Sequence, residues 1–192
     1  MSTQEKSMLN EIMQESQDRM QKSVTAVVDN FKKIRTGRAH PSILDTVMVN
    51  YYGGIVPLSQ VANITVEDAR TLAIVPWEKP MVPEIEKAIL KSSLGLNPAT
   101  SGERIRVPMP ALTEETRKGF IRQARAEAEN GKVSVRAARR DANSYIKELL
   151  KEKEISEDDD RKGQDQIQQL TNKFTTEIDA LLEKKETDLM EI

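Results

Sequence analysis

Basic residues recur at helical spacing along one short part of the sequence, residues 117–140. This part has eight lysines and arginines but only two acids, Glu127 and Glu129, whereas the whole chain has a net charge of −2. Like charges on one helix face repel each other, so the excess needs an explanation beyond helix stability. One set of charged residues repeats every three or four positions and would span roughly 30 Å of a helix: Lys118, Arg122, Arg125, Glu129, Lys132, Arg136 and Arg139.

Two explanations fit this basic stripe. Long basic side chains often lie along the flanks of a helical bundle, with their apolar stems packed and their charges in water. Alternatively, the stripe binds the backbone of a polyanion, because the planar guanidinium of arginine can bind phosphate with two hydrogen bonds. We favour the second explanation and predict a binding surface for RNA or another anionic partner, with Arg117 and Arg140 at its ends.

The sequence offers little catalytic chemistry. It has no cysteine and a single histidine, His40, for which we predict a structural or exposed role beside Pro41. It has no phosphate-binding loop of the G-x-x-x-x-G-K-[ST] type and no nucleophile elbow. The acidic run 157–160 lacks the spacing and the glycine of a calcium loop, and we interpret it as the first turn of a helix. We therefore predict no enzymatic activity, no metal and no cofactor.

Aromatic residues are scarce, at 4% of the chain. Trp77 and the pair Tyr51–Tyr52 could stack on nucleic-acid bases. We favour the alternative that they pack in a core or a turn, because a chain with so few aromatic residues needs them there.

A second pattern predicts the helix that positions the basic stripe, from Thr113 to about residue 152. Apolar or small residues alternate in spacings of three and four, which is typical of a helix in a left-handed bundle. Arg117 falls on the same register, so we expect it beyond the packed end of the bundle, where it can reach RNA. The predicted seam residues are Ile121, Ala124, Ala128, Gly131, Val135, Ala138, Ala142, Tyr145 and Leu149.

Two further helices are expected, at residues 4–34 and after Ser156. Both carry apolar residues at helical spacing, and the short connection before Ser156 predicts an antiparallel return. Two helices alone would leave the apolar face of residues 4–34 uncovered. We therefore predict an antiparallel three-helix bundle made from both ends of the chain, residues 1–36 and 112–192.

Glycines and prolines mark a different kind of structure between these helical regions. Five of the eight glycines and all eight prolines fall within 37–110. Strands are predicted at Asp45–Tyr52, Asn63–Val66, Thr71–Val75 and Ile105–Val107, with a short helix from Pro83 to about Ser93. The fold class is thus α+β with two domains, in which residues 37–111 form a small β-rich insert. The predicted hinge residues are Arg35, Thr36, Gly37, Arg38, Pro108 and Pro110.

The remaining properties indicate a soluble, cytosol-like, monomeric protein. The N-terminus is polar, and no apolar run approaches the roughly 18–20 residues that span a membrane. From Glu154 onward the chain has twelve acids against five bases. This asymmetry leaves one alternative function open, a protein–protein adaptor that binds through its acidic third helix.

Several motifs, in order along nearly the whole chain, resemble the bacterial ribosome recycling factor family. They are Lys33-Ile34-Arg35-Thr36-Gly37-Arg38-Ala39, Thr65-Val66-Glu67-Asp68, Leu94-Gly95-Leu96-Asn97-Pro98, Ile105-Arg106-Val107-Pro108, Val135-Arg136-Ala137-Ala138-Arg139-Arg140-Asp141-Ala142-Asn143 and Lys153-Glu154-Ile155-Ser156-Glu157-Asp158-Asp159.

This resemblance implies an L-shaped protein, similar in outline to tRNA, that acts after translation termination. With elongation factor G and GTP, such a protein splits the post-termination complex so that ribosome and mRNA can be reused. The bundle is expected to lie on the large ribosomal subunit and contact its RNA, and elongation factor G is expected to push the insert. Arg117, Arg136 and Arg139 match family positions implicated in the RNA contact.

Overall fold

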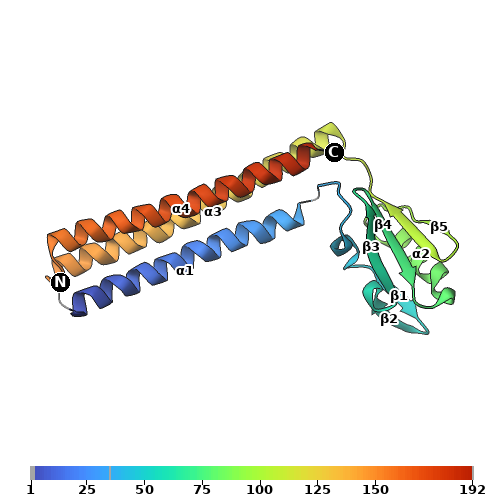
Figure 1. The fold of residues 1–192 in the computed structure, drawn as a ribbon, viewed down its shortest axis with the longest axis horizontal. Helices are drawn as coiled ribbons and strands as arrows, with labels where there is room; N and C mark the ends of the chain where they lie inside the picture. The colour runs from blue at the N-terminus through green and yellow to red at the C-terminus, as the bar shows by residue number, and fades with distance from the viewer. Residues whose placement is uncertain (1–2, 35, 192) are drawn as a thin grey trace. The chain divides into compact units, whose positions relative to one another are not determined.

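The computed structural model describes residues 3–34 and 36–191, which form two compact units (Figure 1). One unit consists of Met1–Ile34 and Glu115–Glu191, and the other is Arg35–Glu114. The first is built from long helices and the second from two small antiparallel sheets with a short helix. The predicted two-domain α+β fold is confirmed.

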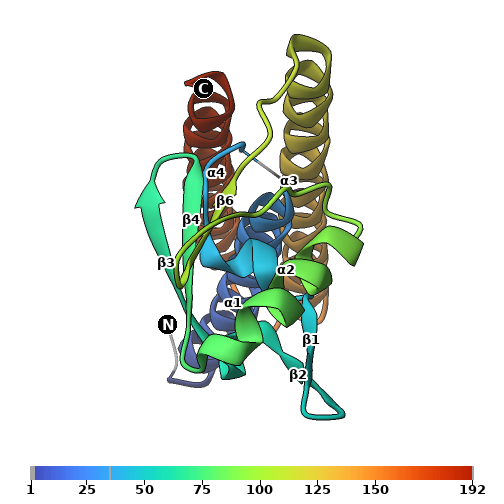
Figure 2. The ribbon, with the colours of Figure 1, turned by 90° about the vertical axis from the view of Figure 1, so that its right-hand side faces the viewer.

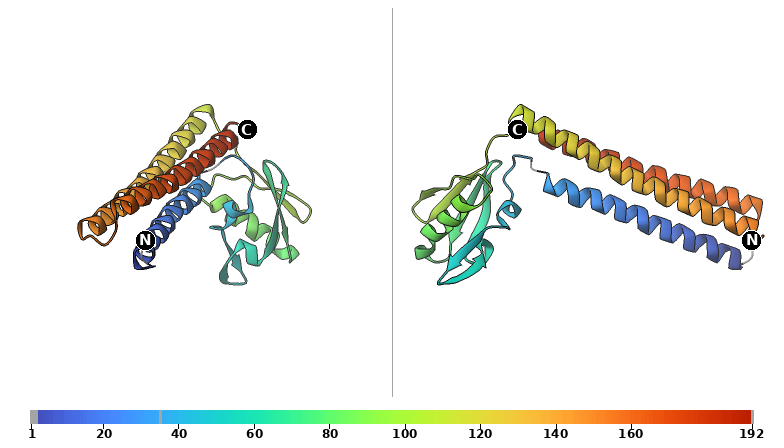
Figure 3. Two further views of the ribbon diagram at one scale, coloured as in Figure 1. Left: turned by 60° about the vertical axis from the view of Figure 1, so that its left-hand side comes forward. Right: turned by 180° about the vertical axis from the view of Figure 1, so that it is seen from behind.

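Three long helices form the first unit. They are α1 (Thr3–Lys33), α3 (Glu114–Lys151) and α4 (Glu157–Met190). The three lie side by side in every view, with α3 running against the direction of α1 and α4 (Figures 1 and 3). Polar contacts join α1 to α3, since Asn30 Nδ2 donates to Glu127 Oε2 at 2.8 Å and Arg19 pairs with Asp141 at 2.8 Å.

The apolar seam of α3 is buried as predicted over most of its length. The buried residues of α3 are Ala124, Ala128, Gly131, Val135, Ala138, Ala142 and Ile146. Tyr145 was predicted in this seam and is 53% exposed, so that prediction is wrong. An α-helix drifts by about 20° per heptad relative to a strict seven-residue repeat, and after three heptads the buried position has moved on to Ile146.

Gly131 marks the tightest approach between helices. A Cβ atom at this position would lie 2.3 Å from Val27 Cγ2 and 3.3 Å from Ile178 Cδ1. Valine has little freedom to turn away, because its branched side chain has one preferred rotamer in a helix. The bundle therefore needs glycine here for packing, although glycine lowers the intrinsic stability of the helix.

We expect Gly131→Ala to destabilise the protein by about 1–3 kcal/mol, since overpacking outweighs the gain in helix propensity. Gly119→Ala is the matched control on the same helix, because nothing lies within 4 Å of a Cβ there. This control should be neutral or more stable by up to about 1 kcal/mol. Urea unfolding measures both changes, and equal effects of the two substitutions would contradict the packing role of Gly131.

A capping box begins α4, where the sequence predicts the first turn of a helix. The backbone N–H of Asp159 donates to Ser156 Oγ at 3.1 Å, and the backbone N–H of Ser156 donates to Asp159 Oδ2 at 3.2 Å. The Ser156 hydroxyl also donates to Asp159 Oδ2 at 2.7 Å, and this contact holds the pKa of Asp159 below its ordinary value. The acids of residues 157–160 thus lie in the first turn of a helix.

This lowered pKa makes part of the stability dependent on pH. A carboxyl whose pKa is lower in the folded state stabilises the fold above its unfolded pKa, and the contribution is lost as the pH falls through the folded pKa. We therefore expect Asp159→Asn to be less stable than the natural protein at pH 7. Unfolding curves should show this difference shrinking once the pH falls below about 4. A difference that stays constant down to pH 2 would contradict the assignment.

The second unit contains two antiparallel sheets. The smaller sheet pairs β1 with β2, and the larger has the order β3-β4-β6-β5. Two of these strands, β2 and β5, were not predicted. The strands are β1 (Met48–Tyr51), β2 (Gly54–Pro57), β3 (Ala62–Asp68), β4 (Thr71–Pro76), β5 (Ala99–Ser101) and β6 (Arg104–Pro108).

One helix, α2 (Val82–Lys91), completes the hydrophobic core of this unit and contacts β1 (Figure 2). Its Ile85 and Ile89 are fully buried in the same cluster as Ile74 and Ile105 of the larger sheet. Val49 of β1 is also buried there, while Met48 is exposed, as alternation along a strand predicts.

The chain passes between the two units at residues 34–35 and 114–115. In the first unit, Lys185 Nζ donates to the carbonyl of Ile34 at 3.1 Å, and partial burial lowers the pKa of this lysine. In the second, the N–H groups of Ala39 and Met109 donate to the carbonyls of Ala69 and Arg70. Ile34 is therefore held to α4, and the insert ends of both connections are held to the turn between β3 and β4.

The predicted hinge residues fall in different settings. Gly37 has φ 76°, a left-handed conformation that glycine adopts without strain. Pro108 is the last residue of β6, paired with Thr71, whereas Pro110 lies outside any strand or helix. Thr36 and Arg38 also lie outside helices and strands, and Arg35 lies outside the described residues.

Candidate nucleic-acid interface

Two of the predicted RNA-binding residues form ion pairs with acids of α4. Arg125 Nε pairs with Glu186 Oε1 at 2.5 Å, and Lys132 Nζ pairs with Asp179 Oδ1 at 2.9 Å. The contact with Asp179 raises the pKa of Lys132, and that with Glu186 raises the pKa of Arg125. These two cations already have carboxylate partners, so the bundle-flank explanation accounts for them.

Arg139 lies seven residues further along the same side of α3 and contacts a neutral group. Its Nη1 donates to Gln168 Oε1 of α4 at 3.1 Å. This hydrogen bond orients the guanidinium without cancelling its charge. A half-buried, oriented arginine whose charge remains is well suited to bind phosphate, because less side-chain freedom is lost on binding.

Arg136 has a partner on its own helix. Its Nη1 pairs with Glu129 Oε1 at 3.0 Å, and Lys132 lies 3.5 Å from the other oxygen of the same carboxylate. The Arg136 contact holds the pKa of Glu129 below its ordinary value, so this acid is ionised at neutral pH. The Arg136 pair is exposed on both sides, and such pairs contribute little stability. Arg136 can therefore exchange this partner for a phosphate at low cost.

The outermost cations of α3 face solvent. Lys118, Arg122 and Arg140 are exposed. Within the part of the chain that the structure describes, the side chains of Arg122 and Arg140 make no hydrogen bond and no ion pair. Together with Arg136 and Arg139 they form the outer basic face, a name kept below for Lys118, Arg122, Arg136, Arg139 and Arg140.

The sequence led us to expect Arg117 beyond the packed end of the bundle, but the structure does not place it there. It is half-buried, and its Nη1 donates to the carbonyl of Met190 at 3.4 Å. Met190 is the last residue of α4, whose final carbonyls have no partner within the helix. Arg117 therefore closes the end of α4, and this contact directs its guanidinium toward the bundle.

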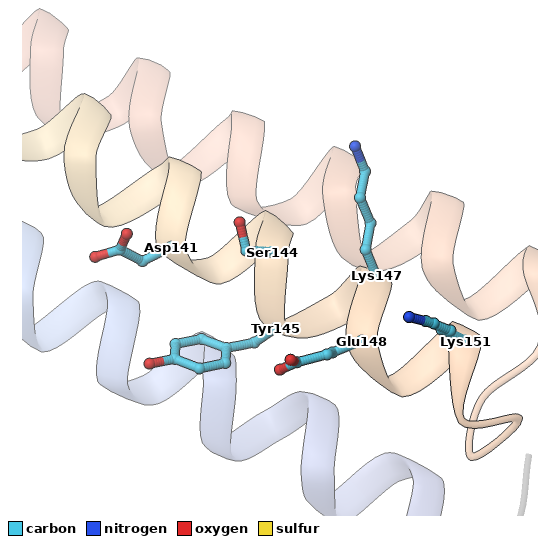
Figure 4. Close-up of a pocket in the computed structure, with 6 residues that line it drawn as sticks. All are labelled: Asp141, Ser144, Tyr145, Lys147, Glu148 and Lys151. Atoms are coloured by element: carbon cyan, nitrogen blue, oxygen red, sulfur yellow. The ribbon is translucent and has the colours of Figure 1, made fainter.

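Two further lysines of α3, Lys147 and Lys151, continue the exposed basic residues toward the end of the helix. They line a shallow hollow of about 540 Å³ with Asp141, Ser144, Tyr145 and Glu148 (Figure 4). Lys147 comes 7 residues after Arg140, and Lys151 comes 4 residues after Lys147. This helical spacing is the signal that could have revealed them. Sequence reasoning missed it because the search ended where the run of arginines ended.

The hollow in Figure 4 is not arranged for catalysis. The Ser144 hydroxyl donates to the carbonyl of Arg140 at 3.0 Å, and Asp141 pairs with Arg19 of α1. No histidine lines the hollow, so the serine has no base beside it. His40, the one histidine of the chain, hydrogen-bonds Ser42 and caps the 3₁₀ turn Pro41–Leu44.

Two searches of residues 3–34 and 36–191 bear on other kinds of site. They contain no group of three or more His, Cys, Asp or Glu placed to hold a metal ion. None of their helices combines the length and the apolar character that a membrane span requires.

Comparison with known proteins supplies the identity of the fold. The family model described as ribosome recycling factor matches residues 27–190. A ribosome-recycling factor from Marinomonas sp. (strain MWYL1) is 66% identical over 185 residues, which is 96% of this chain and 100% of the relative. The chain belongs to the ribosome recycling factor family. A member from Saccharophagus degradans is 64% identical with the same coverage.

Solved structures of the family agree with this assignment. A solution structure of the ribosome recycling factor shares 37% identity, with a TM-score of 0.71, 96% of this chain covered and 98% of that chain. A second structure is described as the T. thermophilus ribosome recycling factor and the E. coli elongation factor G bound to the E. coli post-termination complex. It shares 42% identity with a TM-score of 0.61, and covers 95% of this chain and 98% of that one.

Proposed function

We propose that this chain recycles ribosomes after termination, by binding the large ribosomal subunit and, with elongation factor G and GTP, splitting the post-termination complex. Its membership of the ribosome recycling factor family, at 66% identity over the full length of a relative, carries this proposal. The structure of a family member with elongation factor G on a post-termination complex supports the choice of partners. The chain then acts in the cytoplasm as a monomer, by binding rather than by catalysis.

The outer basic face is the proposed contact with ribosomal RNA. Arg136 and Arg139 make the main contacts, and the face is held straight by a helix whose opposite side is packed into the bundle. Arginine binds phosphate with a charge-assisted pair of hydrogen bonds. Arg125 and Lys132, already paired with α4, add to the local potential, and Arg117 contributes where the bundle ends.

The pairing across α3 and α4 also weakens the alternative of an adaptor that binds through its acidic third helix. Glu186 and Asp179 of α4 are engaged by Arg125 and Lys132, so part of that helix's negative charge is used within the bundle. A binding partner would have to displace Arg125 and Lys132 before it could pair with Glu186 and Asp179.

We further propose that the bundle (residues 1–36 and 112–192) and the insert (37–111) move relative to each other during splitting. Gly37, with its left-handed φ, and Pro110, outside regular structure, are suited to absorb changes in backbone angles. The proposed joint also includes Arg35, Thr36, Arg38 and Pro108.

A splitting assay tests the proposed function. Purified chain is added to post-termination complexes with elongation factor G and GTP, and the ribosomal species are separated on a sucrose gradient. We expect conversion of 70S complexes to free subunits only when all three additions are present. Complexes that stay intact with all three would overturn the proposal.

A further inference from the structure

Glu129 is the one acid among the charged residues that repeat every three or four positions along α3, from Lys118 to Arg139. Its carboxylate contacts two of the basic residues in this repeat. Oε1 accepts from Arg136 Nη1 at 3.0 Å, and Oε2 lies 3.5 Å from Lys132 Nζ. A phosphate bound beside Arg136 would use its oxygens in the same way. The carboxylate therefore takes the place of a phosphate at Arg136.

This carboxylate is the most exposed of the three groups. The side chain of Glu129 is 55% exposed, against 44% for Arg136 and 20% for Lys132. It is ionised at neutral pH, because the Arg136 contact holds the pKa of Glu129 below its ordinary value. A phosphate that approaches Arg136 therefore meets a negative charge, and like charges brought together at an interface lower affinity.

The neighbouring arginine of the outer basic face is held by a different kind of group. Arg139 Nη1 donates to Gln168 Oε1 at 3.1 Å. Glutamine and glutamate have side chains of the same shape, and each accepts a hydrogen bond through a terminal oxygen. Only the glutamate also cancels the charge of the arginine that it holds. Arg139 is thus oriented with its charge available, whereas the charge of Arg136 is compensated.

Helix stability gives Glu129 only a small role. Ion pairs that stabilise a helix join residues three or four apart. Glu129 and Arg136 are seven residues apart, about 10 Å along the axis, so both side chains must extend along the helix to meet. Such ordering costs side-chain entropy, and exposed pairs contribute little. Lys132, three residues from Glu129, has a shorter contact of 2.9 Å with Asp179. The effect of Glu129 on Arg136 is the better explanation of its position.

We propose that Glu129 is an internal competitor for RNA phosphate, which occupies Arg136 in the free chain and must be displaced when RNA binds. Lys132 stays with Asp179, so the competition is for Arg136 alone. The inference rests on the proposed function in one respect, namely that the ligand of Arg136 is the RNA of the large ribosomal subunit.

The competitor sets the affinity of the outer basic face below the maximum that its arginines could reach. Among variants of one interface, differences in affinity lie mostly in the dissociation rate. A carboxylate ready to pair with Arg136 again therefore favours release of the chain from the subunit. A protein that acts on one ribosome after another has to leave each of them, so a limited affinity serves repeated rounds.

Two variants with opposite expected effects test this inference. Glu129→Gln keeps an acceptor for Arg136 and removes the competing charge, while Gln168→Glu places a competing charge on Arg139. Binding of the labelled full chain to purified large subunits is measured at fixed salt, and dissociation is followed after adding excess unlabelled natural chain. We expect Glu129→Gln to bind about threefold to tenfold more tightly, mainly through slower dissociation, and Gln168→Glu to bind more weakly by a similar factor.

Glu127→Gln is the matched control, because it removes the same charge from the same helix. Glu127 accepts from Asn30 of α1 and not from a residue of the outer basic face. We expect this control to change affinity by about twofold or less, through the long-range potential alone. The gain from Glu129→Gln should also vanish in a chain that carries Arg136→Gln, since the two residues then no longer interact.

The measurement on the natural chain keeps this inference separate from the proposed function. A natural chain that does not bind large subunits would overturn both. If the natural chain binds and Glu129→Gln binds no more tightly, or more weakly, Glu129 orients Arg136 for RNA and the competitor alone is overturned. A gain that is equal in Glu127→Gln, or that persists in the Arg136→Gln chain, would overturn it as well.

Discussion

Arg139→Glu is expected to weaken binding to the large ribosomal subunit by roughly tenfold to a hundredfold. Arg139 is held by the neutral Gln168, so its charge remains available to a phosphate. A carboxylate at the same place would remove one charge-assisted contact and repel the RNA. Filter binding or cosedimentation with purified large subunits at fixed salt measures the loss.

Arg125→Gln is the matched control for this prediction. Arg125→Gln removes one positive charge from the same helix, as Arg139→Gln would, but from a residue paired with Glu186. We expect a change in affinity of about twofold or less, because the paired charge contributes mainly through the long-range potential. Equal losses from the two variants would mean that the division of α3 into paired and available cations has no functional meaning. Circular dichroism spectra should show that both variants keep the helices.

Phe174→Ala is expected to lower the free energy of unfolding by about 3–5 kcal/mol, the usual cost of emptying a phenylalanine site in a core. Phe174 is 1% exposed and lies in the bundle cluster with Met20, Val27 and Ile178. All three helices contribute to this cluster, so the cavity cannot be filled by movement of one side chain. Urea unfolding followed by circular dichroism measures the change.

Phe120→Ala provides the comparison for Phe174. Phe120 packs against the same cluster but is only partly buried, so its removal should cost about 1–2 kcal/mol. A loss at Phe174 no larger than that at Phe120 would contradict the assignment of the bundle core.

The seam of α3 shows how far a repeat in the sequence can predict packing. Six of its nine predicted residues are buried, because alternating spacings of three and four follow one face of a helix. The end of the seam could not be predicted from a strict heptad. The burial of Ile146 in place of Tyr145 depends on the small difference between 3.5 and 3.6 residues per turn, summed over the helix.

Short strands were harder to predict than helices. β5 has only the three residues Ala99–Ser101, all exposed, and β2 is Gly-Ile-Val-Pro. Neither has an alternating pattern of its own. Each pairs with a neighbouring strand, β5 with β6 and β2 with β1. Such strands depend on pairing with the adjacent strand of a hairpin rather than on a pattern of their own.

The predicted RNA-binding residues illustrate the same limit for side chains. Their spacing along α3 identifies a basic face, but it does not show which of them have partners. Arg125 and Glu186 are 61 residues apart in sequence and meet only because α4 returns along α3. The separation of paired Arg125 and Lys132 from the outer basic face therefore required the structure.

The dependence of subunit binding on salt tests most directly whether the outer basic face holds RNA phosphates. Affinity for purified large subunits is measured over a range of salt concentrations for the natural chain, Arg136→Gln/Arg139→Gln and Arg125→Gln/Lys132→Gln. Each phosphate contact releases counterions, so the first double variant should reduce the slope of log affinity against log salt by about two. The second should leave the slope nearly unchanged, because its cations are paired with α4. An unchanged slope for Arg136→Gln/Arg139→Gln would contradict the proposed RNA contact.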